Sequence, residues 1–352
     1  MTVEDRVRAE AAALGFSGCG FAVARPIDRG AFLDGWLAAG FAGGMHYLGR
    51  HPERRLTVAG ILPAARTVIS LTFPYTAAPP PVVDWRRALR GRVAAYATGR
   101  DYHLAVDERL VALERALARL FPGRQTKRYV DTGAVLEREW AFRAGLGWFG
   151  KNTMLLGTRA GSWFFLAELV TEAELVPDAP VEEHCGRCTR CLDACPTSAL
   201  GEGLVMDARR CIAYLTIEHR GAIPVALRSQ LGPWIFGCDV CQEVCPWNAP
   251  PTATQAPDGG GLYPFLPDLL RLDRSAFRRR FGATSFARTR RRGLLRNAAV
   301  VLGNTGNPAA VPALTHALGD REPLIRQHAA WALGAIGGSD ARDALGARAD
   351  RE

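Results

Sequence analysis

The residues of this chain best suited to chemistry are its cysteines, eight of nine of which lie between residues 185 and 245. The first group has the spacing Cys-x-x-Cys-x-x-Cys-x-x-x-Cys-Pro from Cys185 to Pro196. In bacterial ferredoxins this spacing holds one 4Fe-4S cluster with three thiolates, and the fourth cysteine binds a second cluster. The spacing therefore predicts one-electron redox chemistry.

The second group repeats the pattern with one position missing, because Ile235 stands where its first cysteine is expected. Cys211 can supply the missing thiolate, which gives eight ligands for two clusters. The predicted ligands of one cluster are Cys185, Cys188, Cys191 and Cys245. The predicted ligands of the other are Cys195, Cys211, Cys238 and Cys241.

Zinc and disulfides are the alternatives for so many cysteines. Structural zinc sites use two separate Cys-x-x-Cys pairs, whereas this chain has three closely spaced cysteines and then Cys-Pro. Disulfide scaffolds are typical of small secreted proteins, and this chain has 352 residues. The spacing thus favours two iron–sulfur clusters.

Length and composition indicate a globular protein of two or three domains, with 48% apolar and 22% charged residues. The first ten residues are polar, which predicts no signal peptide. No apolar run is long enough to span a membrane. Together with eight thiolates that would hold reduced iron, these features predict a cytoplasmic protein.

The net charge of +9 is concentrated in one stretch. Residues 271–296 contain ten arginines and a single acid, Asp273. Such clustering is typical of a surface that binds a phosphate backbone, although a solvated helical face is the plainer alternative. The interleaved Phe277, Phe281 and Phe286 are expected to anchor short helices in a core.

The elements needed to position these residues follow from hydrophobic periodicity. Helices are expected over residues 3–14, 102–120 and 135–144, and strands over 67–73, 127–130 and 162–170. This mixture predicts an α+β protein whose residues 1–175 form an α/β domain around a sheet.

Two further domains are expected after residue 175. Residues 176–250 form a ferredoxin-like domain, with a helix over 207–219 that carries Cys211, and residues 251–262 form a linker. Residues 263–352 contain the basic stretch and a 31-residue repeat, in which Leu294 matches Ile325 and Gly303 matches Gly334. Each repeat predicts a HEAT-like helical hairpin.

Three short motifs suggest other chemistry. Gly145 to Lys151 approaches a phosphate-binding loop, but Asn152 stands where Ser or Thr is required, so an NTPase is rejected. Asp131 precedes a helical stretch, and from the residues alone a helix N-cap is favoured over catalysis. Asp101 and His103 begin a cobalamin-binding signature, but Val106 replaces its glycine.

The chain also contains longer stretches of sequence that resemble a known protein family, and the resemblance covers nearly the whole chain. They occupy residues 130–139, 145–153, 161–165, 184–191, 211–224 and 236–248. With the cysteine spacing and the helical repeats, they resemble the epoxyqueuosine reductases, iron–sulfur and cobalamin enzymes that complete queuosine in tRNA.

The resemblance implies that the 1–175 domain binds cobalamin and that epoxyqueuosine is reduced to queuosine at the wobble position of tRNAs for Asp, Asn, His and Tyr. It implies that Asp131 is the general acid that protonates the leaving epoxide oxygen. An ordinary Asp is ionised at neutral pH, so this role requires burial to raise its pKa. The incomplete His signature predicts that no protein histidine binds cobalt.

The resemblance also implies contacts and partners. The expected cobalamin contacts are Arg54 or Arg55, Asp131, Lys151, Asn152, Thr153, Ser162, Thr216 and Gln242, the last beside Cys241. The expected tRNA phosphate contacts are Arg278, Arg279, Arg280, Arg290, Arg291, Arg292 and Arg296. A low-potential donor such as ferredoxin or flavodoxin would supply electrons to a monomeric enzyme.

Two other functions are alternatives for such a chain. A related corrinoid and iron–sulfur reductase of a small molecule, such as a dehalogenase, would need neither the repeats nor the arginines. An electron-transfer module would not need the N-terminal 175 residues.

Overall fold

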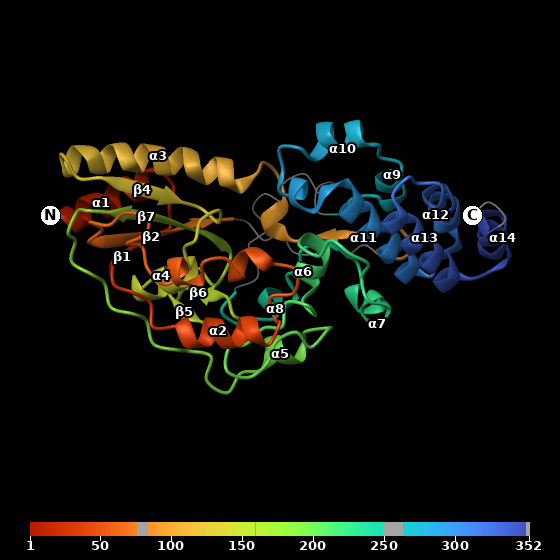
Figure 1. Cartoon of the computed structure of the whole chain (residues 1–352), viewed down its shortest axis with the longest axis horizontal. Coiled ribbons are helices and arrows are strands. Elements are labelled where there is room, and N and C mark those ends of the chain that lie inside the picture. The colour runs from red at the N-terminus through yellow and green to blue at the C-terminus, as the bar shows by residue number, and fades with distance from the viewer. Residues whose placement is uncertain (76–83, 159, 249–262, 350–352) are drawn as a thin grey trace.

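The computed structural model describes residues 1–75, 84–158, 160–248 and 263–349. The expected linker at 251–262 lies outside these residues. The chain is elongated, with a sheet near the N-terminus, the cysteine-rich segment in the middle and stacked helices near the C-terminus (Figure 1). None of the described helices is both long and apolar enough to cross a membrane.

The N-terminal part is built on a four-stranded sheet in which every neighbouring pair is antiparallel. Its order is β1 (Gly18–Val23), β2 (Thr67–Pro74), β7 (Phe164–Thr171) and β4 (Thr126–Tyr129). The strands expected from the sequence are therefore present, and the domain is a mixed α/β one with an antiparallel sheet.

Helices cover both faces of this sheet. The helices α1 (Val3–Ala13) and α3 (Tyr102–Leu120) pack on one face through a core that includes Ile69 and Leu71. The helix α4 (Glu137–Arg143) packs on the other face. Side chains alternate along a strand, so Ser70 of β2 and Glu168 of β7 point to the α4 side.

The helix α3 forms where its pattern predicts it. Its buried residues Val106, Leu110, Leu113 and Leu117 recur at helical spacing, which places one apolar stripe against the sheet. The side chain of Asp101 accepts a hydrogen bond from the His103 amide and caps the first turn. The chain therefore enters α3 with Tyr102 and His103 in its first turn.

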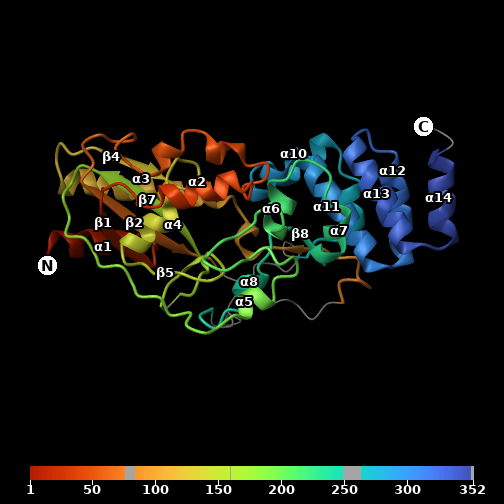
Figure 2. The ribbon, with the colours of Figure 1, turned by 60° about the horizontal axis from the view of Figure 1, so that its bottom comes forward.

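The cysteine-rich segment contains short helices: α5 (Arg190–Asp193), α6 (Ile212–Ile217), α7 (Val225–Arg228) and α8 (Val240–Glu243). The expected helix over 207–219 is shorter than predicted, because α6 begins after Cys211, which is its N-cap. Figure 2 shows α5 and α8 side by side, and the two helices are in contact.

One segment of the N-terminal third crosses to the rest of the molecule. The strand β3 (Arg92–Val93) pairs in parallel with β8 (Trp234–Phe236) of the cysteine-rich segment. Leu89 and Ala97 are buried in the same core as the C-terminal helices. A single domain over 1–175 therefore does not describe how residues 84–97 pack.

The C-terminal part consists of two helical hairpins, as the 31-residue repeat predicts. They are α11 (Arg290–Thr305) with α12 (Val311–Leu318), and α13 (Pro323–Ile336) with α14 (Ser339–Ala349). The helices α11 and α13 pack closely, and a Cβ at Gly303 would lie 2.9 Å from Ala332. Glycine at this position permits that approach.

Short helices join the repeats to the cysteine-rich segment. They are α9 (Leu266–Leu270), α10 (Arg274–Phe281) and the 3-10 helix η5 (Ser285–Thr289). Phe277, Phe281 and Phe286 are buried, and successive rings lie 5.5 and 4.9 Å apart. The expectation that these rings anchor helices in a core is confirmed.

Candidate active site

The structure gathers the four cysteines predicted for the first cluster. Cys185, Cys188, Cys191 and Cys245 all line a cavity of about 90 Å³. The charges of Cys185 and Cys245 act on Cys191, and burial raises the pKa of the Cys191 thiol. Four thiols around one small cavity fit a cubane cluster.

The other four cysteines form a second, deeper group. Burial raises the pKa of the Cys238 thiol, and the charges of Cys211 and Cys241 raise it further. Cys195 in turn raises the pKa of Cys211. The backbone amide of Ala199 donates to Cys195 Sγ at 3.3 Å, the kind of bond that stabilises a cluster sulfur.

All nine cysteines are free thiols. Within the described part of the chain, no three His, Cys, Asp or Glu side chains form a site for a single metal ion.

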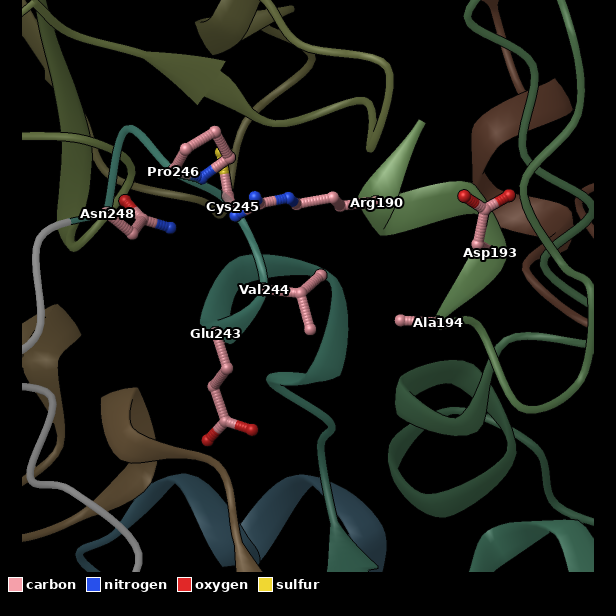
Figure 3. A pocket seen from close by; sticks show the side chains of 8 residues that line it. All are labelled: Arg190, Asp193, Ala194, Glu243, Val244, Cys245, Pro246 and Asn248. Atoms are coloured by element: carbon pink, nitrogen blue, oxygen red, sulfur yellow. The ribbon is translucent and has the colours of Figure 1, made fainter. Parts of the chain in front are cut away.

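An open cleft of about 700 Å³ lies between α5 and α8, beside the first cysteine group. Its lining includes Cys245 and Pro246 together with the charged residues Arg190, Asp193 and Glu243. The Arg190 side chain extends from α5 toward Cys245 and Pro246 (Figure 3). Because Arg190 and Cys245 also line the 90 Å³ cavity, the cleft gives access to the first group from outside.

Asp131 lies beyond the end of β4 in a conformation that L-residues rarely adopt, with φ of 50°. Its Oδ2 accepts a hydrogen bond from Tyr102 Oη at 2.8 Å and lies 3.3 Å from His103 Nε2. The N-cap of α4 is Leu136, not Asp131. The interpretation of Asp131 as an N-cap is therefore wrong, and its carboxylate instead faces the first turn of α3.

The expected rise in the Asp131 pKa is not found in this structure. Burial raises the pKa of Asp131, but the hydrogen bonds from His103 and Tyr102 outweigh it, and the pKa lies below its ordinary value. Burial lowers the pKa of His103, yet the hydrogen bonds to Asp131 and Asp101 raise it overall. The hydrogen bonds within this pair thus favour the ionised carboxylate of Asp131 and the protonated ring of His103.

Aromatic rings hold the Asp131 site in place. The Tyr102 ring stacks on Phe165 of β7 with the centroids 4.1 Å apart. Tyr96 packs edge-on to both Tyr102 and Phe165. These contacts fix the hydroxyl that donates to Asp131.

Arg138 lies near both Asp131 and the deeper cysteine Cys241. We call the space around these three side chains the recess. Asp131 and Arg138 are exposed to solvent, yet the surrounding protein desolvates both, as expected for side chains that line a hollow. Desolvation lowers the pKa of Arg138, while the charges of Glu137, Asp131 and Cys241 raise it. Arg138 thus lies between the acid and a predicted cluster ligand, which the sequence did not indicate.

Three of the expected cofactor contacts converge beside Cys241. The Asn152 amide donates to the Cys241 carbonyl at 3.2 Å, and Ser162 Oγ donates to Gln242 Oε1 at 2.9 Å. Thr153 accepts a hydrogen bond from Arg138 at 2.5 Å. Asn152, Ser162 and Gln242 are thus buried beside Cys241, and Thr153 contacts Arg138.

The other expected cofactor contacts lie in different environments. Lys151 donates to the Gly186 carbonyl at 2.7 Å and lines the cavity of the first cysteine group. Arg54 is exposed on the short helix η2 (Pro52–Arg55), where Arg55 donates to the Tyr47 carbonyl at 3.0 Å. Thr216 is fully buried, and its hydroxyl joins α6 to the Gly237 amide.

The basic stretch divides into exposed and internal arginines. The guanidinium groups of Arg278, Arg279, Arg280 and Arg290 are exposed, and Arg292 is half-buried. Arg291 pairs with Asp320 and donates to the Leu272 carbonyl at 2.5 Å. Arg291 is thus held within the repeats.

Arg296 does not fit the expectation of a phosphate contact. Its side chain is fully buried and donates to the carbonyls of Leu215, His219 and Gly221 at 2.6 to 2.8 Å. Asn297 beside it donates to Thr216 and Ile235 carbonyls at 2.8 Å. Arg296 therefore joins α11 to the cysteine-rich segment.

Two arginines missed by the sequence prediction lie near the acid. Arg288 donates to Glu218 at 2.6 Å and its charge acts on Asp131. Arg220 donates to the Arg288 carbonyl at 2.7 Å and faces the charges of Arg290 and Arg292. A basic surface thus continues from α11 toward Asp131.

The fold and the two cysteine groups define an iron–sulfur oxidoreductase that carries helical repeats. Residues 184–248 match the family described as a 4Fe-4S double cluster binding domain, and residues 286–352 match HEAT repeats. Residues 55–132 match the family described as "Epoxyqueuosine reductase QueG, DUF1730".

Whole-chain comparisons agree with these matches. An epoxyqueuosine reductase of Xanthomonas campestris pv. campestris is 42% identical over 93% of this chain and 94% of its own. A crystal structure of epoxyqueuosine reductase with an epoxyqueuosine-modified tRNA-Tyr stem loop has a TM-score of 0.91 at 32% identity, over 99% of this chain and 94% of that one.

A Bacillus subtilis epoxyqueuosine reductase structure, whose catalytic Asp loop is swung out of the active site, gives the same TM-score of 0.91, identity of 32% and coverage of 99% and 94%. The chain belongs to the epoxyqueuosine reductase family.

Proposed function

We propose that this chain reduces epoxyqueuosine to queuosine at the wobble position of the tRNAs for Asp, Asn, His and Tyr, using two 4Fe-4S clusters and cobalamin. The observation that carries the proposal is the position of Arg138 between Asp131, which lies 3.3 Å from His103, and the deeper cysteine group. An acid on one side and an electron source on the other match a reaction that consumes two electrons and two protons and releases water.

The clusters would carry electrons inward. Cys185, Cys188, Cys191 and Cys245 hold the outer cluster beside the open cleft, and Cys195, Cys211, Cys238 and Cys241 hold the inner one. A low-potential donor such as ferredoxin or flavodoxin would reach the outer cluster.

The recess residues fit a polar, multiply substituted cofactor such as cobalamin. When bound and reduced, cobalamin supplies a strongly nucleophilic cobalt that can engage an epoxide carbon. Asn152, Ser162 and Gln242 would hold it on the cysteine side and Thr153 near Arg138, with Lys151 and Arg54 or Arg55 farther out. Thr216 would act through the backbone that it supports.

His103 would take part in proton transfer and would not bind the cobalt. Its Nδ1 lies 2.7 Å from Asp101 and its Nε2 lies 3.3 Å from Asp131, so both ring nitrogens have carboxylate partners. Asp131 would pass a proton from His103 Nε2 to the oxygen that leaves the substrate carbon. This arrangement avoids an alkoxide leaving group.

The exposed arginines would bind the tRNA. Arg278, Arg279, Arg280, Arg290 and Arg292 lie on or before α11, and Arg288 and Arg220 extend this surface toward Asp131. Phosphate contacts of this kind fix the register of the RNA, while an unpaired wobble base enters the recess. The enzyme would act in the cytoplasm as a monomer.

The test is anaerobic reconstitution followed by nucleoside analysis of tRNA that contains epoxyqueuosine. The Asp131→Asn variant should keep its iron and cobalamin but form no queuosine, since an amide can accept from Tyr102 but cannot give up a proton. The matched control is Asp107→Asn, which alters a surface ion pair with Arg128. Wild-type turnover by Asp131→Asn would refute the role of Asp131.

A further inference from the structure

A pair of carboxyl groups, the half-buried Glu137 and the fully buried Glu168, lies beside Asp131. Glu137 begins α4, and Glu168 lies in the middle of β7 with no exposed surface. Among the described residues, neither oxygen of Glu168 has a hydrogen-bond donor, and the buried hydroxyl of Ser70 also has no partner. Ser70 and Tyr129 are the cross-strand neighbours of Glu168 on β2 and β4.

Two carboxylates cannot both remain charged in such a place. Burial raises the pKa of Glu137 to about 7, and the neighbouring charge of Asp131 adds to this effect. Burial also raises the pKa of Glu168 well above its ordinary value, and the neighbouring charge of Glu137 raises it further. The charged or titratable groups around Glu137 include Asp131, Arg138, Glu168 and Tyr102. One proton between the two glutamates removes the repulsion.

Glu137 also controls the backbone of Asp131. Its Oε1 accepts the Asp131 amide at 2.6 Å. The left-handed conformation of Asp131, with φ of 50°, is unfavourable for a residue with a Cβ and persists when its surroundings hold it. Gly133 completes the turn, since a Cβ there would lie 2.3 Å from the Tyr129 ring.

We propose that Glu137 is the positioning residue that holds the Asp131 loop in its active conformation, and that a proton shared with Glu168 keeps Glu137 in place. The inference rests on the proposed role of Asp131 and deepens it. Loss of the shared proton at alkaline pH leaves Glu137, Glu168 and Asp131 all negative in one small region. Their repulsion then releases the loop.

Hydrogen–deuterium exchange of the Asp131 amide tests whether Glu137 holds the Asp131 loop, and it needs no tRNA. In the reconstituted enzyme, Glu137→Ala should raise exchange at this amide by about tenfold, the equivalent of one lost hydrogen bond. Glu137→Gln should keep protection, because its carbonyl oxygen accepts the amide and its NH₂ donates to Glu168. The matched control is Glu108→Gln, an exposed residue of α3 paired with Arg100. Unchanged exchange in Glu137→Ala would overturn the proposal.

The shared proton is tested with Glu168→Gln, whose amide donates to Glu137 at every pH. Wild-type exchange at Asp131, corrected for the intrinsic rate, should rise as pH increases from 7 to 9, whereas Glu168→Gln should stay protected. Infrared spectra should show a protonated carboxyl band at neutral pH that Glu168→Gln lacks. An equal rise in both proteins, or a band that persists in the variant, contradicts the shared proton.

Activity adds a readout that a purely structural role would not give. Glu137→Ala should lower kcat at least tenfold with an unchanged KM for tRNA, and Glu137→Gln should restore kcat. If the wild-type enzyme formed no queuosine, the proposed function would be wrong. The exchange and infrared results would still show whether Glu137 holds the Asp131 loop. If Glu137→Ala and Glu137→Gln lowered kcat equally and exchange at the Asp131 amide stayed unchanged in both, only the positioning role of Glu137 would be refuted.

Discussion

His328 predicts how the contact between the repeats and the cysteine-rich segment responds to acid. It lies on α13 with no exposed surface. Its Nε2 accepts the Ile223 amide at 3.1 Å, so Nδ1 carries the proton and donates to the Leu324 carbonyl at 2.7 Å. The neutral ring therefore connects a repeat helix to the segment before α7.

The magnitude follows from the pKa of this ring. Burial lowers the pKa of His328 to about 4, and the charges of Arg228 and Arg296 contribute. The unfolded chain has a histidine pKa near 6.5 and so binds the proton more tightly. The stability that the neutral ring contributes to the fold is complete above pH 6.5 and is lost as the pH falls toward 4. The loss is about 2 kcal/mol between pH 7 and 5, and about 3.4 kcal/mol in full.

The assay is anaerobic urea denaturation of the wild type and of His328→Gln between pH 5 and 7. Glutamine does not titrate, so the variant should be about 1 kcal/mol less stable at pH 7 because it fits one hydrogen bond poorly. It should lose about 2 kcal/mol less than the wild type on acidification. His316→Gln, an exposed histidine of α12, is the control. Equal acid sensitivity in His328→Gln and wild type would refute the reasoning.

Three other perturbations give separate tests. Cys211→Ser should halve the iron content of the reconstituted chain, measured by iron analysis, and full iron content would contradict the assignment of Cys211. Arg290→Ala should weaken tRNA binding and lower the slope of the binding constant against salt concentration, on logarithmic scales, by about one. Arg296→Met should leave this slope unchanged but lower the free energy of unfolding by about 3 kcal/mol, because three buried carbonyls lose their donor. Gly20→Ala should lower the melting temperature by several degrees, because its Cβ would lie 2.0 Å from the Ala144 carbonyl oxygen, and an unchanged melting temperature would be inconsistent with that contact.

Features encoded by local spacing could be predicted from the sequence. The helix α3 begins and ends where its apolar periodicity predicts, at Tyr102 and Leu120. The repeat of 31 residues predicts the two hairpins that are present, and the four thiols predicted for the first cluster line one cavity. That these thiols bind a cluster stays a prediction. In each case the signal lies within one helix, one repeat or one motif, so no distant contact is needed to interpret it.

Features that depend on distant contacts could not be predicted. Asp131 resembled an N-cap because the residues next to it suit one, while its partners Tyr102 and His103 lie on an earlier helix. Arg296 resembled its exposed neighbours in sequence, but the turn of α11 points it inward to three carbonyls of another segment. The pairing of β3 with β8 has no signal in either strand, since both are short.

The path of residues 84–97 sets the order in which a newly made chain can mature. This segment leaves the ribosome early, but its strand partner β8 is synthesised well over a hundred residues later, and the helices that cover Leu89 later still. The growing polypeptide must therefore carry this segment without its strand partner until β8 has been made. The nascent N-terminal portion cannot reach its final form by itself, and cofactor loading must wait for nearly the entire chain.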